Sequence, residues 1–426
     1  MRERALDTTK IGFRYYPDTQ HYTQQDLEIW LPELRTLGTE VLVLEGSARF
    51  AIPEIFITGL IHSGIRPVIH IPSGFSQLEA AEFEALLSAY ANWGVTEVVV
   101  GDRPNQRTSW EAADWSRSNL VERFVDRLLP VLEAEFRHGL TPLLPPLQPG
   151  GDYWDTAFLR DTLAALQRRA HPGILQALGL AINVWTFGKP LDWGMGGAAA
   201  WPQTIPYMTS ETSQDQLGFR IMDWYNEITL AVLGHICPLY ATSGGSRFSH
   251  QTADDMTSSH SEQNAAIFSQ LRNEPIAGLT MFAFDHLVSL PSDPRHKDAW
   301  FASAGVGRPV IAAIRSIAAT ERKLPSPSSK QTYAAIEHVV FLPDEDYAVC
   351  AELLREAAPF LAVAKPVITF DLESVGAFRR ATVLANHPVS SARQHELVQH
   401  GETFAFFDRN TIPALNAAAS ASQAEA

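Results

Sequence analysis

The feature that most constrains the fold is a regular alternation of short apolar segments with longer segments of helical periodicity over residues 11–320. The apolar segments are hydrophobic at nearly every position, which is typical of strands buried on both faces of a parallel sheet under helices. Eight such strand–helix units within about 310 residues favour a closed (β/α)8 TIM barrel over an open sheet. The predicted strands are residues 11–16, 41–45, 66–71, 97–101, 140–144, 178–187, 236–241 and 276–285.

A small α/β domain is predicted to follow the barrel. The barrel is assigned to residues 1–323, the Pro/Ser-rich segment 324–332 to a linker, and residues 333–415 to the small domain. The Ala/Ser-rich residues 416–426 are predicted to be a disordered tail, because they offer little apolar surface to bury. The elements predicted in the small domain are strands at 335–342, 366–370 and 403–407 and helices at 348–361 and 394–400.

Charge and hydropathy exclude several classes of partner. The 426-residue chain has a formal net charge of −15 and no run of Lys or Arg, which argues against nucleic acid or an anionic membrane as partner. No apolar run approaches the roughly 20 residues of a membrane span, and no N-terminal signal segment is apparent, so we expect a cytoplasmic protein. The two cysteines, Cys237 and Cys350, are predicted to be buried free thiols. No pattern indicates an oligomeric state.

We expect neither a cofactor nor a metal ion. No GxGxxG follows the first strand and no phosphate-binding GxxxxGKS or GxxxxGKT occurs, which argues against a bound nucleotide. Metal hydrolases on this fold take His side chains from several strand ends, and His70 and the pair Asp285–His286 fit part of that pattern. The first strand lacks a His-x-His pair, however, and the fifth and sixth strands end without His.

Candidate site residues follow from the fold, because TIM barrels place their active sites at the C-terminal ends of the strands. These ends and the loops after them are also rich in tryptophan, and we single out Trp154 and Trp185. An exposed indole face stacks well on the apolar face of a sugar ring, but a tryptophan can equally pack a long loop against the barrel. The side chains delivered by the other strand ends include Arg14, Glu45, Asp102, Arg103, Asn105, Ser243 and Asp285.

Two strand ends resemble those of the clan-A glycoside hydrolases, the retaining cellulase-, mannanase- and xylanase-like enzymes. In that family the fourth strand ends in Asn-Glu-Pro, whose Glu is the general acid/base, and the seventh ends in a Glu nucleophile that is often followed by Gly. Here the fourth strand runs into Gly101-Asp102-Arg103-Pro104, and the seventh into Thr242-Ser243-Gly244-Gly245. Aligned on the proline and on the glycines, the resemblance places Arg103 at the acid/base position and Ser243 at the nucleophile position.

These two replacements predict a loss of hydrolysis. Retaining hydrolysis needs two carboxyl groups about 5–5.5 Å apart. Arg103 cannot donate a proton near neutral pH, and Ser243 has no neighbouring base in the sequence to activate it. We therefore predict a non-catalytic barrel that binds a carbohydrate or glycoconjugate. The predicted ligand-binding residues are Arg14, Arg103, Asn105, Trp154, Trp185 and Ser243.

Two alternatives stay open. In the first, the barrel is an active glycosidase in which other carboxylates have taken over, with Asp102 paired with Glu45 or Asp285. For Glu45 and Asp102, a helix cap or an ion pair with Arg49 or Arg103 competes with a catalytic role. In the second alternative the chain is an assembly or scaffold protein, which predicts an exposed apolar patch and no usable pocket.

Overall fold

The computed structural model describes residues 9–247, 256–323, 336–343, 347–369, 378–386 and 401–424. The chain forms two compact units, Met1–Lys323 and Leu324–Ala426. The predicted linker at 324–332 and the predicted helix at 394–400 lie outside the described residues. None of the helices in the described ranges is both long and apolar enough to cross a membrane.

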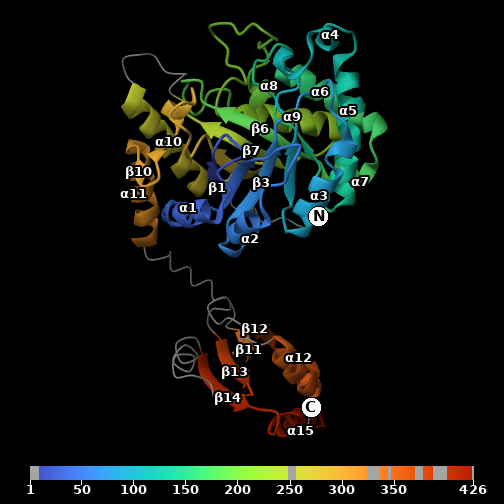
Figure 1. Ribbon diagram of the computed structural model, residues 1–426, viewed down its shortest axis with the longest axis vertical. Coiled ribbons are helices and arrows are strands. Elements are labelled where there is room, and N and C mark those ends of the chain that lie inside the picture. Colours follow the sequence, from blue (N-terminus) through green and yellow to red (C-terminus); the bar gives the residue numbers. More distant parts are fainter. Residues whose placement is uncertain are drawn as a thin grey trace. The chain divides into compact units, whose positions relative to one another are not determined.

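The first unit is a (β/α)8 barrel, as the sequence predicts (Figure 1). Its eight strands are parallel and follow the order β4-β3-β2-β1-β8-β7-β6-β5. The two end strands of that order, β4 and β5, are joined by a parallel bridge between Glu97 and Thr141, which closes the ring. The strands are β1 (Lys10–Arg14), β2 (Val41–Glu45), β3 (Arg66–Ile71), β4 (Glu97–Val100), β5 (Leu143–Leu144), β6 (Gly179–Trp185), β7 (Leu239–Gly245) and β8 (Leu279–Phe284).

A long helix follows each strand and covers the outside of the ring (Figure 1). These helices are α1 (Gln24–Thr36), α2 (Glu54–His62), α3 (Glu84–Asn92), α5 (Leu120–Arg137), α6 (Asp155–Arg169), α9 (Ile221–Leu233), α10 (Met256–Asn273) and α11 (Pro309–Lys323). Shorter helices lie in the connections: α4 (Ala112–Trp115), α7 (Pro172–Ala177) and α8 (Gly197–Ala200).

Two strands begin later than the sequence predicts. The fifth was expected from residue 140 and the seventh from residue 236, but β5 begins at Leu143 and β7 at Leu239. Each strand starts directly after a proline, Pro142 or Pro238. Proline has no N–H to give to the sheet ladder, so it confines the strand to the residues that follow it. In compensation β7 extends through Gly245, with register shifts against both of its neighbours.

Side chains alternate between the two faces of the barrel wall, as the two-residue period of a strand requires. Leu42 and Leu44 of β2 belong to the large core under the helices. The intervening residues form a second apolar cluster, which fills the barrel interior and consists of Val41, Val43, Val68, Val99, Leu143, Ala181, Tyr240, Met281 and Ala283. Continuing the same alternation toward the C-terminal ends, the next inward positions are polar: Arg14, Glu45, His70, Asn183 and Asp285. The alternation thus carries these side chains to the mouth of the barrel.

The seam between β4 and β5 depends on a buried carboxyl group. β5 has only two residues, and the N–H of Leu143 donates to Oε2 of Glu135 in α5 at 3.0 Å. Burial raises the pKa of Glu135 well above its usual value, although the bond from Leu143 opposes that effect. Glu135 therefore supplies an acceptor that a longer strand pairing would have provided.

The second unit is a small four-stranded parallel sheet with helices. The strand order is β12-β11-β13-β14, and a core that includes Val340, Leu353 and Phe360 packs on it. Cys350 lies in this core and Cys237 in the barrel, so the prediction of two buried, unbridged thiols is confirmed. The elements are β11 (Ile336–Phe341), α12 (Tyr347–Glu356), α13 (Ala358–Ala364), β12 (Val367–Thr369), β13 (Phe378–Leu384), β14 (Gly401–Phe407) and α15 (Ile412–Ala424).

The structure differs from the sequence-based prediction at two places in this unit. β13 is central in the sheet but was not predicted, because its first half, Phe-Arg-Arg, is largely charged. α15 covers most of the segment predicted to be a disordered tail. The side chain of Asn416 accepts from the N–H of Phe360 at 3.1 Å and donates to the carbonyl of Glu356 at 2.9 Å, which ties this helix to α12 and α13.

We expect Glu135→Gln to raise the free energy of unfolding at neutral pH. The amide keeps an acceptor for Leu143 but has no charge to bury. A carboxyl whose pKa is raised by folding contributes stability below its unfolded value, and that stability is lost as the pH rises. The gain over wild type should therefore be present at pH 7 and vanish below about pH 4.

Urea denaturation at several pH values would measure this effect. The matched control is Glu133→Gln, on the exposed face of the same helix, for which we expect little change. A Glu135→Gln protein less stable than wild type at pH 7 would contradict the role assigned to this carboxyl group.

Candidate functional site

A pocket opens at the C-terminal ends of the barrel strands, where the sequence predicts the site. Its volume is about 120 Å³, and it is strongly polar. The lining residues come from the ends of six strands and the loops after them, so the barrel scaffold fixes their directions. They are Arg14, His70, Asp102, Arg103, Asn183, Trp185, Ser243, Arg247, Asp285, His286 and Arg295.

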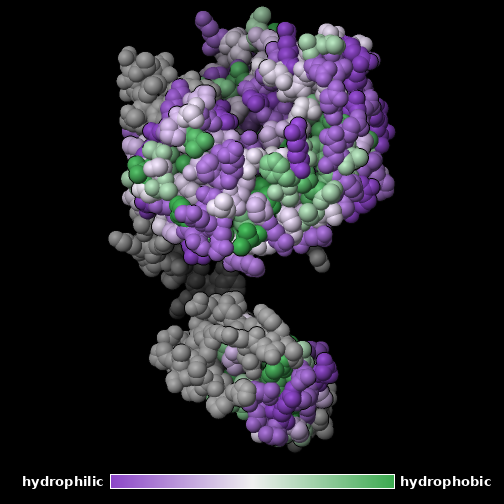
Figure 2. Space-filling view, viewed as in Figure 1, coloured by the Kyte–Doolittle hydropathy of each residue, from purple (hydrophilic) through white to green (hydrophobic). Residues whose placement is uncertain are grey.

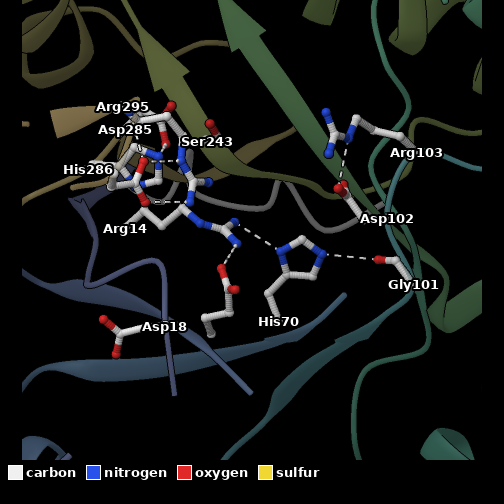
Figure 3. A network of polar contacts seen from close by, with 12 residues as sticks. Arg14, Asp18, His70, Gly101, Asp102, Arg103, Ser243, Asp285, His286 and Arg295 are labelled. Carbon is white, nitrogen blue, oxygen red and sulfur yellow. Dashed lines mark hydrogen bonds and ion pairs between the residues drawn. The ribbon is translucent and has the colours of Figure 1, made fainter. Parts of the chain in front are cut away.

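One side of the pocket is built around Arg14, which lies at the end of β1 and is buried (Figure 3). Its Nη2 donates to Oε2 of Glu45 at 3.1 Å, and its Nη1 contacts Nδ1 of His70 at 2.9 Å. Because arginine can only donate, Nδ1 of His70 must be the acceptor and its Nε2 must carry the proton. That Nε2–H donates to the carbonyl of Gly101 at 3.0 Å. Burial and the charge of Arg14 lower the pKa of His70 to about 4, so its imidazole is neutral at physiological pH.

A second cluster joins the ends of β6, β7 and β8. Arg247 forms an ion pair with Asp285, and its guanidinium carbon lies 3.8 Å from the ring centroid of Trp185. The hydroxyl of Ser243 accepts from Nε1 of Trp185 at 3.0 Å and from Nη2 of Arg247 at 3.3 Å. Within the described residues Ser243 thus meets two donors and no base, and one face of Trp185 is covered by Arg247.

Asp285 is a buried but charged carboxylate. Burial by itself would raise its pKa, but Arg247, followed by His286 and Arg14, brings the pKa well below the usual range. Nε2 of the adjacent His286 lies 3.4 Å from Oδ1 of Asp285. Burial lowers the pKa of His286 to about 4 in spite of this neighbour. The pair is therefore an anionic aspartate beside a neutral histidine.

Two lining residues hold strained backbone conformations. Arg103 has φ of 48° and His286 has φ of 22°, both in the left-handed region that non-glycine residues avoid. The N–H of Arg103 donates to the carbonyl of Pro146 at 2.9 Å, and its Nε donates to Oδ2 of Asp102 at 2.7 Å. Strain of this kind costs on the order of 1–3 kcal/mol per residue and is concentrated at functional sites. Its occurrence at two positions of one pocket favours a functional role.

The pocket brings together six of the nine residues that the sequence singles out: Arg14, Asp102, Arg103, Trp185, Ser243 and Asp285. Glu45 lies behind Arg14 and supports the site without lining it. No two of the three candidate carboxylates share a hydrogen bond or an ion-pair partner, since each is paired with a different arginine.

Asn105 has a structural role in this conformation. It is fully buried, and its Nδ2 donates to the carbonyls of Gln148 and Tyr153, both at 2.9 Å. Its Oδ1 accepts from the N–H of Gln148 at 2.8 Å. With both ends of its amide engaged, Asn105 fastens the loop after β4 to the loop after β5 and does not line the pocket.

Of the two tryptophans that the sequence singles out, Trp185 lines this pocket and is itself buried. Trp154 is buried and lines a separate cavity of about 250 Å³ between α6, α9 and the loop before α9. Trp110 is also buried, and its Nε1 donates to the carbonyl of Pro104 at 2.7 Å. Trp110 thus packs the loop after β4, whereas Trp154 faces the separate cavity.

Five lining residues were not among the predicted site residues: His70, Asn183, Arg247, His286 and Arg295. His70 and Asn183 occupy inward positions near strand ends, so the two-residue period could have identified them. Arg295 carries no such signal, because it reaches the pocket from the loop after β8, held by Asp293. Among the described residues, no three His, Cys, Asp or Glu side chains are grouped so as to hold a metal ion.

Comparisons with known proteins give distant structural similarity only. No protein-family model matches the sequence, and no curated protein shows significant sequence similarity. A GH128 subgroup II endo-β-1,3-glucanase from Pseudomonas viridiflava has 14% identity and a TM-score of 0.46, over 72% of this chain and 98% of that chain. A GH39 enzyme from Xanthomonas axonopodis pv. citri has 14% identity and a TM-score of 0.45, over 73% and 66%. A monomeric β-xylosidase from Caulobacter crescentus CB15 has 13% identity and a TM-score of 0.46, over 73% and 68%.

The neutral state of His70 predicts a pH dependence of stability. In the unfolded chain His70 titrates near its ordinary value of about 6.5, whereas in the folded chain it titrates near 4. The unfolded state therefore binds more protons between these values, and the protein loses stability as the pH falls through this window. His70→Gln removes this group, so we expect its free energy of unfolding to fall less steeply between pH 6.5 and pH 4. A slope should remain, because His260 and His286 are lowered in the same way.

Urea denaturation across this pH range is the appropriate measurement. The control is His62→Gln, in which an exposed histidine of α2 is replaced and the slope should not change. Identical slopes for His70→Gln and wild type would show that His70 is not held neutral by the fold.

Proposed function

We propose that the barrel binds a carbohydrate or glycoconjugate in the pocket at the C-terminal ends of its strands and does not hydrolyse it. The observation that carries this proposal is the make-up of the pocket. The two positions that the family resemblance assigns to catalytic carboxylates hold Arg103 and Ser243, and both side chains line the pocket.

Saccharide binding is supported by the kind of groups that face the pocket. A sugar presents many hydroxyl groups that both donate and accept hydrogen bonds, together with a partly apolar ring. The pocket offers guanidinium donors, an amide at Asn183, a hydroxyl at Ser243 and the indole of Trp185. This is a concave site with convergent polar groups, as small-molecule binding requires.

The absence of hydrolysis is supported by the state of the carboxylates. A glycosidase needs a general acid whose pKa is raised, opposite a second, free carboxylate. Asp285 has a lowered pKa instead, because of Arg247. Asp102 and Glu45 are engaged by Arg103 and Arg14, respectively. These ion pairs favour the non-catalytic proposal over an active glycosidase with relocated carboxylates.

The pocket also favours ligand binding over a scaffold role, for which no usable pocket was expected. The face of the barrel unit shown in Figure 2 is mainly hydrophilic, with apolar residues scattered between polar ones. The most exposed large apolar side chains in the described residues include Ile205, Tyr207 and Met208, which belong to one loop before α9. The other exposed large apolar side chains in the described residues are spread over several elements, which is ordinary on a domain surface.

The proposal predicts binding without turnover. Purified full-length protein should release no aglycone from a panel of aryl glycosides, and Asp102→Asn should behave identically. In a thermal-shift screen of oligosaccharides, at least one should raise the melting temperature. That shift should be lost in Arg295→Ala, which alters the barrel-mouth pocket, and kept in Arg160→Ala, which alters the separate cavity beside α6.

Other results would refute distinct parts of the proposal. Turnover that disappears in Asp102→Asn would make Asp102 a catalytic acid or base and favour the active glycosidase. A shift lost in Arg160→Ala but kept in Arg295→Ala would move the ligand to the cavity beside α6. A complete lack of both turnover and shift would favour the scaffold role.

A further inference from the structure

The pocket gathers four arginines in an acidic protein, and each of them forms an ion pair with a neighbouring carboxylate. Four of its lining side chains are arginines and only two are aspartates, whereas the whole chain carries a formal net charge of −15. The arginines come from β1 and from the loops after β4, β7 and β8: Arg14, Arg103, Arg247 and Arg295.

Two of these arginines are committed to the structure. Both terminal nitrogens of Arg14 are engaged, by Glu45 and by His70. Arg295 forms a two-pronged pair with Asp293, from Nε at 3.0 Å and from Nη2 at 2.9 Å. These two residues contribute charge to the pocket, but they have fewer donors free for a ligand.

The other two arginines retain donors that face no protein acceptor. Arg103 uses only Nε, on Asp102, and neither of its terminal nitrogens donates to another described residue. Its side chain is 46% exposed, close to the 47% of Arg295 and well above the 21% of Arg247. Nε of Arg247 is buried and has no hydrogen-bond partner in the described part of the chain. A ligand with acceptor oxygens would satisfy the terminal nitrogens of Arg103.

Arg103 is placed to meet a ligand from the side opposite Asp285. β4 and β8 lie across the ring from one another, because three strands separate them in either direction. In Figure 3 Arg103 and Asp102 accordingly lie apart from the cluster around Asp285. Arg103 has a strained backbone conformation, and its N–H donates a hydrogen bond to the carbonyl of Pro146. These two features fix the position of its Cα at the edge of the pocket. A ligand lying between the two sides would contact Arg103 from one of them.

From these contacts we infer that the ligand is an acidic saccharide, whose carboxylate pairs with the guanidinium of Arg103. The inference rests on the proposed saccharide-binding function and specifies its ligand class. The two oxygens of a carboxylate match the planar fork of a guanidinium, and a charged pair is stronger than a bond to a neutral hydroxyl. Of the four arginines, Arg103 is the one whose two terminal nitrogens both lack a bond to another described residue, so the recognition rests on its guanidinium.

Calorimetric titration at about 0.15 M salt tests this inference, because screening there limits the effect of charges beyond roughly 8 Å. The probes are disaccharides that contain glucuronic or galacturonic acid, their neutral glucose or galactose counterparts, and inorganic phosphate. We expect the acidic sugars to bind more tightly than the neutral ones. In Arg103→Gln, which keeps a hydrogen-bond donor but loses the charge, their affinity should fall by about tenfold.

The matched control is Arg107→Gln, which makes the same substitution in the same loop. Arg107 is exposed and does not line the pocket, so its replacement should leave every affinity unchanged. The neutral sugars should bind wild type and Arg103→Gln alike, which would show that the pocket of the variant is intact. Thermal denaturation of both variants checks that they fold.

The possible failures are distinguishable. Equal binding of acidic and neutral sugars, with no effect of Arg103→Gln, would overturn the acidic-ligand inference and leave the proposed function standing. Binding of phosphate but of no sugar would overturn both. An equal loss of acidic-sugar affinity in Arg103→Gln and Arg107→Gln would show that the effect is general to the loop's charge, and would also overturn the pairing with Arg103.

Discussion

The buried guanidinium of Arg14 is the interaction on which the mouth of the barrel depends. A charged group inside a barrel is costly unless it is paired and hydrogen-bonded, and here Glu45 supplies the charge and His70 the acceptor. Because His70 must accept on Nδ1, its proton is on Nε2 and is directed to the carbonyl of Gly101. One chain of hydrogen bonds thus joins the ends of β2, β1 and β3 to the residue that precedes Asp102.

The sequence predicted the barrel and much of its polar mouth because both follow from local periodicity. Eight apolar segments specify the strands, and the two-residue alternation carries Arg14, His70 and Asp285 inward at their ends. The loops were less predictable, since a polar loop residue can turn to the pocket or fasten two loops together. Asn105 fastens loops, whereas Arg295 comes from a loop with no periodic signal and reaches the pocket. The predicted starts of β5 and β7 were wrong, because the proline before each strand has no N–H to donate to the neighbouring strand.

Two residues that line the pocket have strained backbone conformations. Arg103 and His286 hold backbone conformations that the surrounding structure must maintain against their intrinsic preference. At the same time, an arginine stands where the resemblance would place a proton donor, and the serine at the nucleophile position contacts donors only. Each pocket arginine is balanced by a carboxylate, and Arg103 keeps both terminal nitrogens without a bond to another described residue. The proposed role is therefore recognition of an anion and not protonation of a leaving group.

The weak pairing of β4 with β5 has a consequence for how this barrel can vary. Elsewhere in the ring, runs of main-chain hydrogen bonds fix the spacing of neighbouring strands. Among the described residues, β4 and β5 share a single bridge. Glu135 accepts a hydrogen bond near the start of β5, and Asn105 joins the loops after β4 and β5. Main-chain hydrogen bonds between strands change only when a whole strand shifts its register. A side-chain hydrogen bond, in contrast, is lost or altered by a single substitution. The aperture beside Arg103 is consequently the part of the mouth that substitution can widen or narrow while the rest of the barrel keeps its register.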